Sequence, residues 1–182
     1  MKSRINERGH TMLEIISILG FLGAFSAGIV HVISTMYDKY KVSRVSQQIE
    51  EIRKSISNRY MAAGSFVGLT ISGLIQDGAV PADMVAGDNE LRHAFMGDVS
   101  VRGYFNRYTV TFSNLPLEAC VELAMIDWTM GDSSDLINLK INGHTYRWPA
   151  APGAGARLLP LQLSDVSNEC VGDDNEIIWN FQ

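Results

Sequence analysis

The stretch RGHTMLEIISILGFLGAFSAGIVHVISTMY, residues Arg8 to Tyr37, decides the architecture of this chain. From Ile15 to Ile33 it contains no Asp, Glu, Lys or Arg. A helix over that run reaches roughly 29 Å, which is close to the thickness of the hydrocarbon layer of a bilayer. One carboxylate, Glu14, stands directly before the run. The sequence therefore predicts a membrane-spanning helix over about residues 11–33, with an acidic side chain in its first turn.

The residues that follow continue the helix but change its character. Apolar residues recur there at spacings of three and four, while polar and charged residues fill the other face, which is the pattern of an amphipathic helix. The apolar positions are Val42, Val45, Ile49, Ile52 and Ile56. We therefore expect one long helix from about Thr11 to Met61, whose second half docks on a folded domain.

Charge is distributed unevenly along the 182 residues, whose formal net charge is −5. The short leader is basic, with Lys2, Arg4 and Arg8 against Glu7. The rest of the chain therefore carries a more negative net charge than the whole chain does. By the positive-inside rule, this asymmetry predicts a cytoplasmic leader and a body on the far side of the membrane. The acidic balance argues against a general nucleic-acid binder.

A secretory signal peptide is the simplest alternative for the apolar stretch. Its cleavage site would be Ala24-Phe25-Ser26, and cleavage there would release a soluble domain. Three features disfavour it: Glu14 interrupts the start, the apolar pattern continues beyond the cut to Ile33, and no helix breaker separates the two halves.

Small residues recur four apart inside the apolar half, a spacing that lets membrane helices approach closely. The pairs are Gly20 with Ala24, Gly23 with Ala27, and Ala24 with Gly28. These residues are candidates for helix–helix packing. The alternative is that they only reflect how common Gly and Ala are in membrane helices.

Beyond Met61 the patterns indicate an α+β domain. Glycines and Pro81 mark a turn-rich connector, and alternating apolar residues further on mark strands. We expect a short helix near 71–76, a hairpin of strands near 98–101 and 108–112, a helix within 117–128, a second hairpin turning at Asn142-Gly143, a loop over 149–160 and a last strand over 176–181. A long helix packed on an antiparallel sheet is the predicted fold.

The sequence offers little chemistry. Its four histidines show no metal-ligand spacing, no phosphate-binding loop occurs, and the acidic runs 131–135 and 172–176 lack the order of an EF-hand and suit turns. We expect no enzyme, no cofactor and no metal. Cys120 and Cys170 fit no metal or redox motif. They can pair if the body lies in an oxidising compartment, and otherwise they are two separate buried thiols.

The motif GHTMLE, residues 9–14, followed by an unbroken apolar helix, resembles the class III signal of type IV prepilins. The resemblance implies that a prepilin peptidase cuts between Gly9 and His10 and that His10 is methylated. The apolar helix is then kept as the filament core. Glu14 would be the fifth mature residue and would pair with the new ammonium of His10 on a neighbouring subunit, which sets the axial register. The alternative is a glutamate that rests in the head-group layer.

The likeness extends to type IVb pilins in particular. The segment 64–84 looks like the one that follows their core helix, and 112–124 and 161–181 look like the two regions that close their C-terminal disulfide loop. The resemblance therefore implies a Cys120–Cys170 disulfide. It also implies three parts: a cleaved leader 1–9, a long helix 10–61 and a globular head 62–182 closed by the 120–170 region.

This family resemblance implies a structural subunit, the major pilin, that polymerises through its apolar helix. The implied partners are copies of itself, a prepilin peptidase, an inner-membrane assembly platform, an assembly ATPase and an outer-membrane secretin. The precursor would sit in the inner membrane with its head in the periplasm, and the mature chain in an extracellular pilus. The alternatives are a minor pilin or type II secretion pseudopilin, and a single-pass anchor for a periplasmic ligand-binding domain.

Overall fold

The computed structural model describes residues 12–60, 64–128, 135–147, 157–159 and 161–182, with the backbone alone at 13, 25–35, 157 and 158. Its first element is α1, Met12–Tyr60, a single helix of 49 residues. The chain forms two compact units, residues 1–40 and 41–182, so α1 contributes to both. The long helix predicted for residues 11–61 is confirmed over its described part, residues 12–60.

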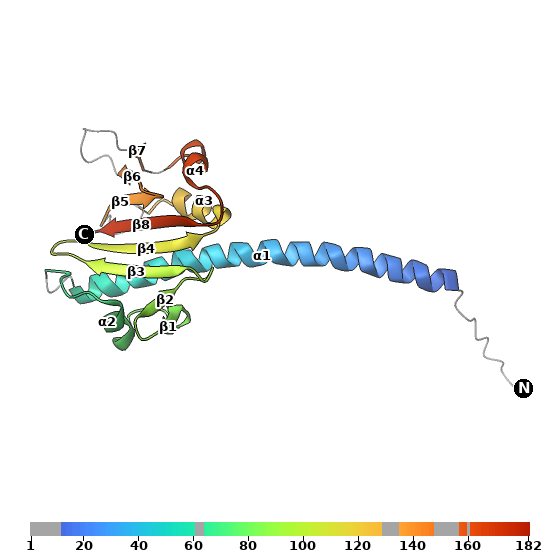
Figure 1. Ribbon diagram of the computed structural model, residues 1–182, viewed down its shortest axis with the longest axis horizontal. Helices are drawn as coiled ribbons and strands as arrows, with labels where there is room; N and C mark the ends of the chain where they lie inside the picture. The colour runs from blue at the N-terminus through green and yellow to red at the C-terminus, as the bar shows by residue number, and fades with distance from the viewer. Residues whose placement is uncertain (1–11, 61–63, 129–134, 148–156, 160) are drawn as a thin grey trace, which may run out of the picture. The chain divides into compact units, whose positions relative to one another are not determined.

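The second part of α1 is an integral piece of the larger unit (Figure 1). Its predicted apolar stripe, Val42, Val45, Ile49, Ile52 and Ile56, is buried in the hydrophobic core. The stripe lies on one face because residues three and four apart in a helix point in the same direction.

An eight-stranded sheet forms the centre of the larger unit, in the order β1-β2-β3-β4-β8-β5-β6-β7. Neighbouring strands are antiparallel, except that β7 runs parallel to β6. The bounds are β1 Val85–Gly87, β2 Glu90–Arg92, β3 Asp98–Gly103, β4 Tyr108–Leu115, β5 Leu136–Ile141, β6 His144–Arg147, β7 Arg157–Leu158 and β8 Asn175–Phe181. Figure 1 shows the last strand, β8, in the middle of the sheet.

Most predicted elements of the head are present. Both hairpins form, and Asn142 and Gly143 turn the second one with φ of 47° and 89°, as a type I′ turn requires. The short helices are α2 Ile71–Gln76, η2 Ala82–Met84, α3 Leu117–Met125 and α4 Leu163–Glu169. The predicted fold class, a long helix with an antiparallel sheet, is confirmed.

Five short elements were not predicted: η2, β1, β2, β7 and α4. Strand β7 corrects the predicted loop over 149–160, because Tyr146 and Arg147 of β6 pair with Arg157 and Leu158. The other residues of that loop, except 159, lie outside the described residues. Elements of two or three residues, such as η2, β1, β2 and β7, are too short for a hydrophobic period to show in the sequence, and α4 spans less than two helical turns.

Aromatic side chains fill the core between the sheet and the helices. Trp179 of β8 meets Phe112 of β4 and Trp128 edge to face, with ring centroids 5.6 and 5.5 Å apart. Tyr108 stacks on Phe181 at 5.2 Å. These side chains alternate along β4 and β8 with outward-facing residues, as the period of two of a strand requires.

A buried histidine occupies one end of this core. His93 stacks on Phe112 with ring centroids 5.3 Å apart, and its Nε2 lies 2.8 Å from the carbonyl oxygen of Ser113. A Cβ at Gly97 would collide with that carbonyl and with the His93 ring, so only glycine fits there. Burial, the largest influence, lowers the pKa of His93 below its usual value, against the opposing effects of Ser113 and Asp98.

We predict that the head becomes less stable as the pH is lowered below about 6.5. Under those conditions the unfolded chain binds a proton at His93 that the folded chain does not bind. The loss has an upper limit of about 1.4 kcal/mol per pH unit and stops below the lowered pKa. Thermal unfolding of the full chain in detergent between about pH 5 and pH 7 measures it. In His93→Gln, which keeps an amide donor for Ser113, the slope should flatten. An unchanged slope would exclude His93 as its source.

Candidate functional site

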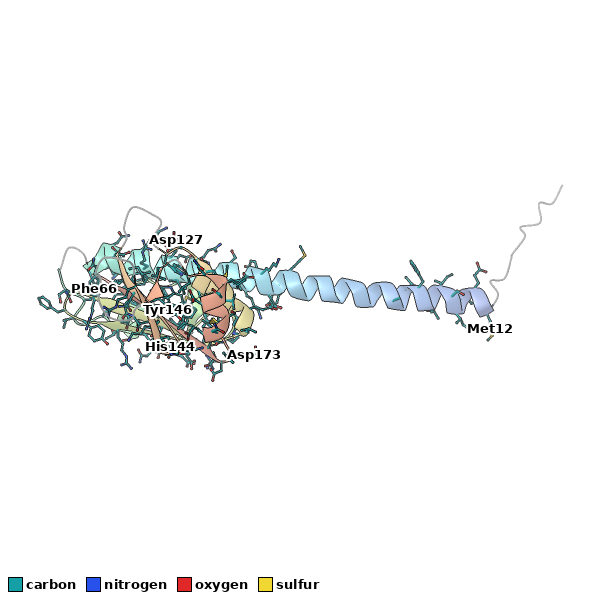
Figure 2. The ribbon with its side chains drawn as sticks, turned by 90° about the horizontal axis from the view of Figure 1, so that it is seen from above. Met12, Phe66, Asp127, His144, Tyr146 and Asp173 are labelled. Carbon is teal, nitrogen blue, oxygen red and sulfur yellow. A yellow bond between two sulfur atoms is a disulfide. The ribbon has the colours of Figure 1, made fainter. Side chains whose placement is uncertain are left out.

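The first turns of α1 present apolar side chains without a covering layer in the described chain. Met12, labelled in Figure 2, is 85% exposed, and Phe21 is 72% exposed. The same holds on other sides of the helix, for Ile15, Ile16, Ile18, Leu19 and Leu22. Glu14 is exposed in the first turn. So large an apolar surface marks a region that lipid or other protein chains cover.

The predicted packing residues are only partly described. Gly20, Gly23 and Ala24 are exposed, and a Cβ built at either glycine meets nothing within 4 Å. At Ala27 and Gly28 the structure gives the backbone alone, and Gly9 and His10 lie outside the described residues. The roles predicted for these residues therefore remain predictions.

A membrane crossing at residues 11–33 also stays a prediction. Among the described residues, no helix combines the length and the hydropathy required to span a bilayer.

A polar cluster fixes α1 to the connector that follows it. Arg44 holds Asp83 with two hydrogen bonds, Nη2 to Oδ1 at 2.7 Å and Nε to Oδ2 at 2.8 Å. The fully buried Gln48 donates to Asp83 Oδ2 at 3.0 Å and accepts from the Ala94 amide at 3.3 Å. The Arg44 hydrogen bond lowers the pKa of the Asp83 carboxyl, so Asp83 stays ionised. This cluster sets the position of the connector along the helix.

The two cysteines form a disulfide, Cys120–Cys170, with Cα atoms 5.8 Å apart. Cys120 lies on α3, and Cys170 directly follows α4. The bond therefore joins the two short helices across 50 residues of chain. The pairing implied by the family resemblance is confirmed, and the alternative of separate thiols is wrong.

Two asparagines organise the same end of the head through contacts that sequence reasoning missed. The buried Asn175, at the start of β8, donates to the carbonyl oxygens of Leu115 and Gly172 at 3.0 and 2.9 Å. Its Oδ1 accepts from the Val171 amide at 2.8 Å. Asn142 donates to Asn175 Oδ1 at 2.9 Å and accepts from the Glu176 amide at 2.9 Å. The Asn-Gly turn signal located Asn142 but gave no sign of this second role.

One further side-chain contact borders this network. The imidazole Nδ1 of His144, at the start of β6, contacts the carboxylate of Glu169, the last residue of α4. Asn142 also donates to the main-chain oxygen of Glu169 at 2.7 Å. The β5–β6 turn is thereby tied to the helix that precedes Cys170.

The described residues offer no cluster of metal-ligating side chains. No three His, Cys, Asp or Glu side chains among them gather closely enough to hold a metal ion. His93 is enclosed by aromatic rings and main chain, and His144 faces one carboxylate. The organised features are an uncovered apolar helix and a cross-linked head, which suit assembly.

Comparison with protein families gives a match over most of the chain. The family model described as PilS N terminal matches residues 39–182. The matched region holds the second part of α1 and the whole sheet, including both cysteines.

Two relatives and one solved structure are similar over long stretches. The toxin coregulated pilin of Vibrio cholerae serotype O1 is 24% identical over 152 residues, 75% of this chain and 64% of that protein, so the match spans less than two thirds of its length. The major structural subunit of bundle-forming pilus of Escherichia coli O111:H- is 19% identical over 93% of this chain and 90% of that protein. The crystal structure of type IV b pilin from Salmonella typhi superposes with a TM-score of 0.52 at 20% identity, over 75% of this chain and 99% of that one.

We predict that loss of the disulfide destabilises the head by about 4 kcal/mol, because the bond closes a loop of 50 residues. Cys120→Ser/Cys170→Ser in the full chain tests this, with urea unfolding as the measurement. Each single variant serves as a control, since it also lacks the bond but keeps one thiol. A double variant as stable as the wild type would contradict the prediction.

Proposed function

The chain belongs to the PilS N-terminal family of type IVb pilins, and from that membership we propose that it is a structural subunit of a type IVb pilus. It polymerises through the first half of α1, as a major pilin. The observation that carries the proposal is the apolar surface around Met12–Leu22, which the described chain leaves uncovered. Packing identical helices side by side covers that surface in every subunit except those at the ends.

Register within such a bundle needs a polar contact, because apolar helices slide past one another at little cost. Cleavage after Gly9 creates an ammonium at His10, four residues before Glu14. In the apolar interior of a filament, a charge costs several kcal/mol unless it is paired. A helix displaced by one turn leaves both charges without a partner, so the pair of Glu14 with a neighbour's His10 selects one register.

Processing and localisation follow from the same proposal. Residues 1–9 form the cytoplasmic leader that a prepilin peptidase removes, residues 10–61 the long helix and 62–182 the head. Residues 11–33 anchor the precursor in the inner membrane with the head in the periplasm. The subunit then passes into an extracellular filament.

The assembly partners rest on the family resemblance and on the apolar helix, which has to leave the bilayer for the filament. That transfer requires an inner-membrane platform, energy from an assembly ATPase, and an outer-membrane secretin as the exit. The small residues Gly20, Gly23, Ala24, Ala27 and Gly28 give the helices room for close approach within the bundle.

We expect the mature chain to begin at His10. Intact-mass analysis of sheared surface filaments should give a chain without residues 1–9, with or without one added methyl group. Gly9→Leu should leave uncleaved precursor in the membrane, because a bulky side chain replaces the small residue at the cut. Retention of Met1 in the filament, or a start near Ala27, would contradict the proposed processing.

We expect Glu14→Gln to abolish or strongly reduce filament formation while leader cleavage continues. Glutamine keeps the shape and a hydrogen-bonding oxygen, so the change removes chiefly the charge that pairs with His10. Sheared filament yield, measured against the amount of cleaved subunit in the membrane, gives the readout.

Glu51→Gln is the matched control for Glu14→Gln, because it removes a carboxylate from the same helix within the head. It should assemble normally. Wild-type filament yield from Glu14→Gln would show that the pairing idea is wrong and that Glu14 is an interfacial residue.

A further inference from the structure

The sheet has a second face, turned away from the aromatic core, and that face is hollowed. A depression of about 530 Å³ runs over β3, β4, β8, β5 and β6. These five strands are neighbours in the sheet (Figure 1). The lining side chains alternate with the buried ones along every strand, so the backbone pleat itself holds them outward.

Strand register places these side chains in rows across the sheet. In one row Arg102 is opposite Thr109, Thr109 is opposite Asn180, Asn180 is opposite Asn138, and Asn138 is opposite Arg147. At about 4.8 Å per strand, the two arginines stand roughly 19 Å apart along the row. The row therefore has a guanidinium at each end and a hydroxyl and two amides between them.

Two more cations belong to the same face. Lys140 lies in the next row, opposite Ile178 of β8 and Thr145 of β6. Arg107, at the end of the β3–β4 hairpin, sits over the ring of Tyr104 at 5.4 Å from its centre. Within the described residues, no ion pair involves Arg102, Arg107, Lys140 or Arg147. Among the described residues that line the depression, Glu176 is the only carboxylate.

This face is positive on a protein whose net charge is −5. The segregation is visible in the sequence, since neither 108–139 nor 158–182 contains Lys or Arg. The four cations share the lining of the depression with one acid, Glu176, and their field attracts an anionic partner. Guanidinium forks suit carboxylates, which they bind with two parallel hydrogen bonds.

The residues that line the depression between the cations favour one class of polyanion over the others. Ser, Thr and Asn form its floor, and Ile178 is its one aliphatic residue. Protein partners prefer apolar and aromatic contact areas, and single-stranded nucleic acid needs aromatic platforms for its bases. The one aromatic side chain here, Tyr104, is occupied by Arg107. Hydroxyl and amide groups instead match the hydroxyls of a sugar chain.

We propose that this outer sheet face is a binding site for an acidic polysaccharide built from uronate sugars. Arg102 and Arg147 bind carboxylates at the two ends of the row. Thr109, Asn138 and Asn180 exchange hydrogen bonds with the sugar hydroxyls between them. Asn180 Nδ2 already donates to Asn138 Oδ1 at 2.7 Å, which leaves a donor on Asn138 and an acceptor on Asn180 for the ligand. The site lies on the head and does not depend on polymerisation.

The test measures binding of polygalacturonate to the full chain in neutral detergent, with dextran as the uncharged sugar and oligothymidylate as the nucleic acid. Polygalacturonate should bind, and its affinity should fall as salt is added. Its affinity should exceed that of the oligonucleotide by about tenfold or more. Dextran should not bind. Absence of polygalacturonate binding at low salt, or equal affinity for oligothymidylate, overturns the proposal.

Variants locate the site. Arg102→Gln/Arg147→Gln should lower the affinity for polygalacturonate by about tenfold or more. The matched control Lys54→Gln/Arg59→Gln removes two exposed positive charges from α1, which packs on the core side of the sheet, and should bind as the wild type does. Equal losses in the two double variants, or no loss in the first, would overturn the assignment to this face.

Discussion

The apolar side chains at Val45, Ile49, Ile52 and Ile56 hold the second part of α1 in the core of the head, and the rest of the head is arranged around that contact. All four are completely buried. At about 25 cal/mol per Å² of apolar area removed from water, each contributes on the order of 1.5–3 kcal/mol. This burial gives the head its own stability, so the apolar first half of the same helix remains available to other chains.

The helix must also be held along its axis, which an apolar stripe alone does poorly. Among the side chains of α1 that the structure describes, Gln48 is the one polar group that is completely buried, and both ends of its amide are used, by Asp83 and by the Ala94 main chain. Arg44 adds a paired contact to the same carboxylate. A displacement by one turn would break all of these bonds and leave a buried amide without partners, which is costly in a low-dielectric interior. The same logic, a polar contact that fixes the register of an apolar surface, is what we propose for Glu14 and His10 in the filament.

At the other end of the sequence, the C-terminal strand completes the sheet. Strand β8 inserts between β4 and β5, so the sheet closes only when the last residues of the chain are in place. Asn175 fixes the beginning of that strand through main-chain bonds to Leu115 and Gly172, and the disulfide fixes the helix before it. Covalent and hydrogen-bonded constraints thus act on one short region, which suits the extracellular head that we propose. The outer face of the same strand forms the middle of the proposed polysaccharide site.

The sequence by itself determined the long helix, its two contrasting halves, the two hairpins and the α+β fold. Those features depend on hydrophobic periods of 2 and 3.6 residues and on turn-forming pairs such as Asn142-Gly143. Residues close together in the sequence are enough to determine them. Only the tertiary structure decided the central place of β8, the contacts of Asn175 and Gln48, and the alignment of Arg102 with Arg147. Each of these joins residues that are far apart in the chain, and no local pattern encodes which strands become neighbours. The cysteine pairing depended on both sequence and tertiary structure. The family resemblance implied the pair, and the packing of α3 against α4 brought the two sulfur atoms together.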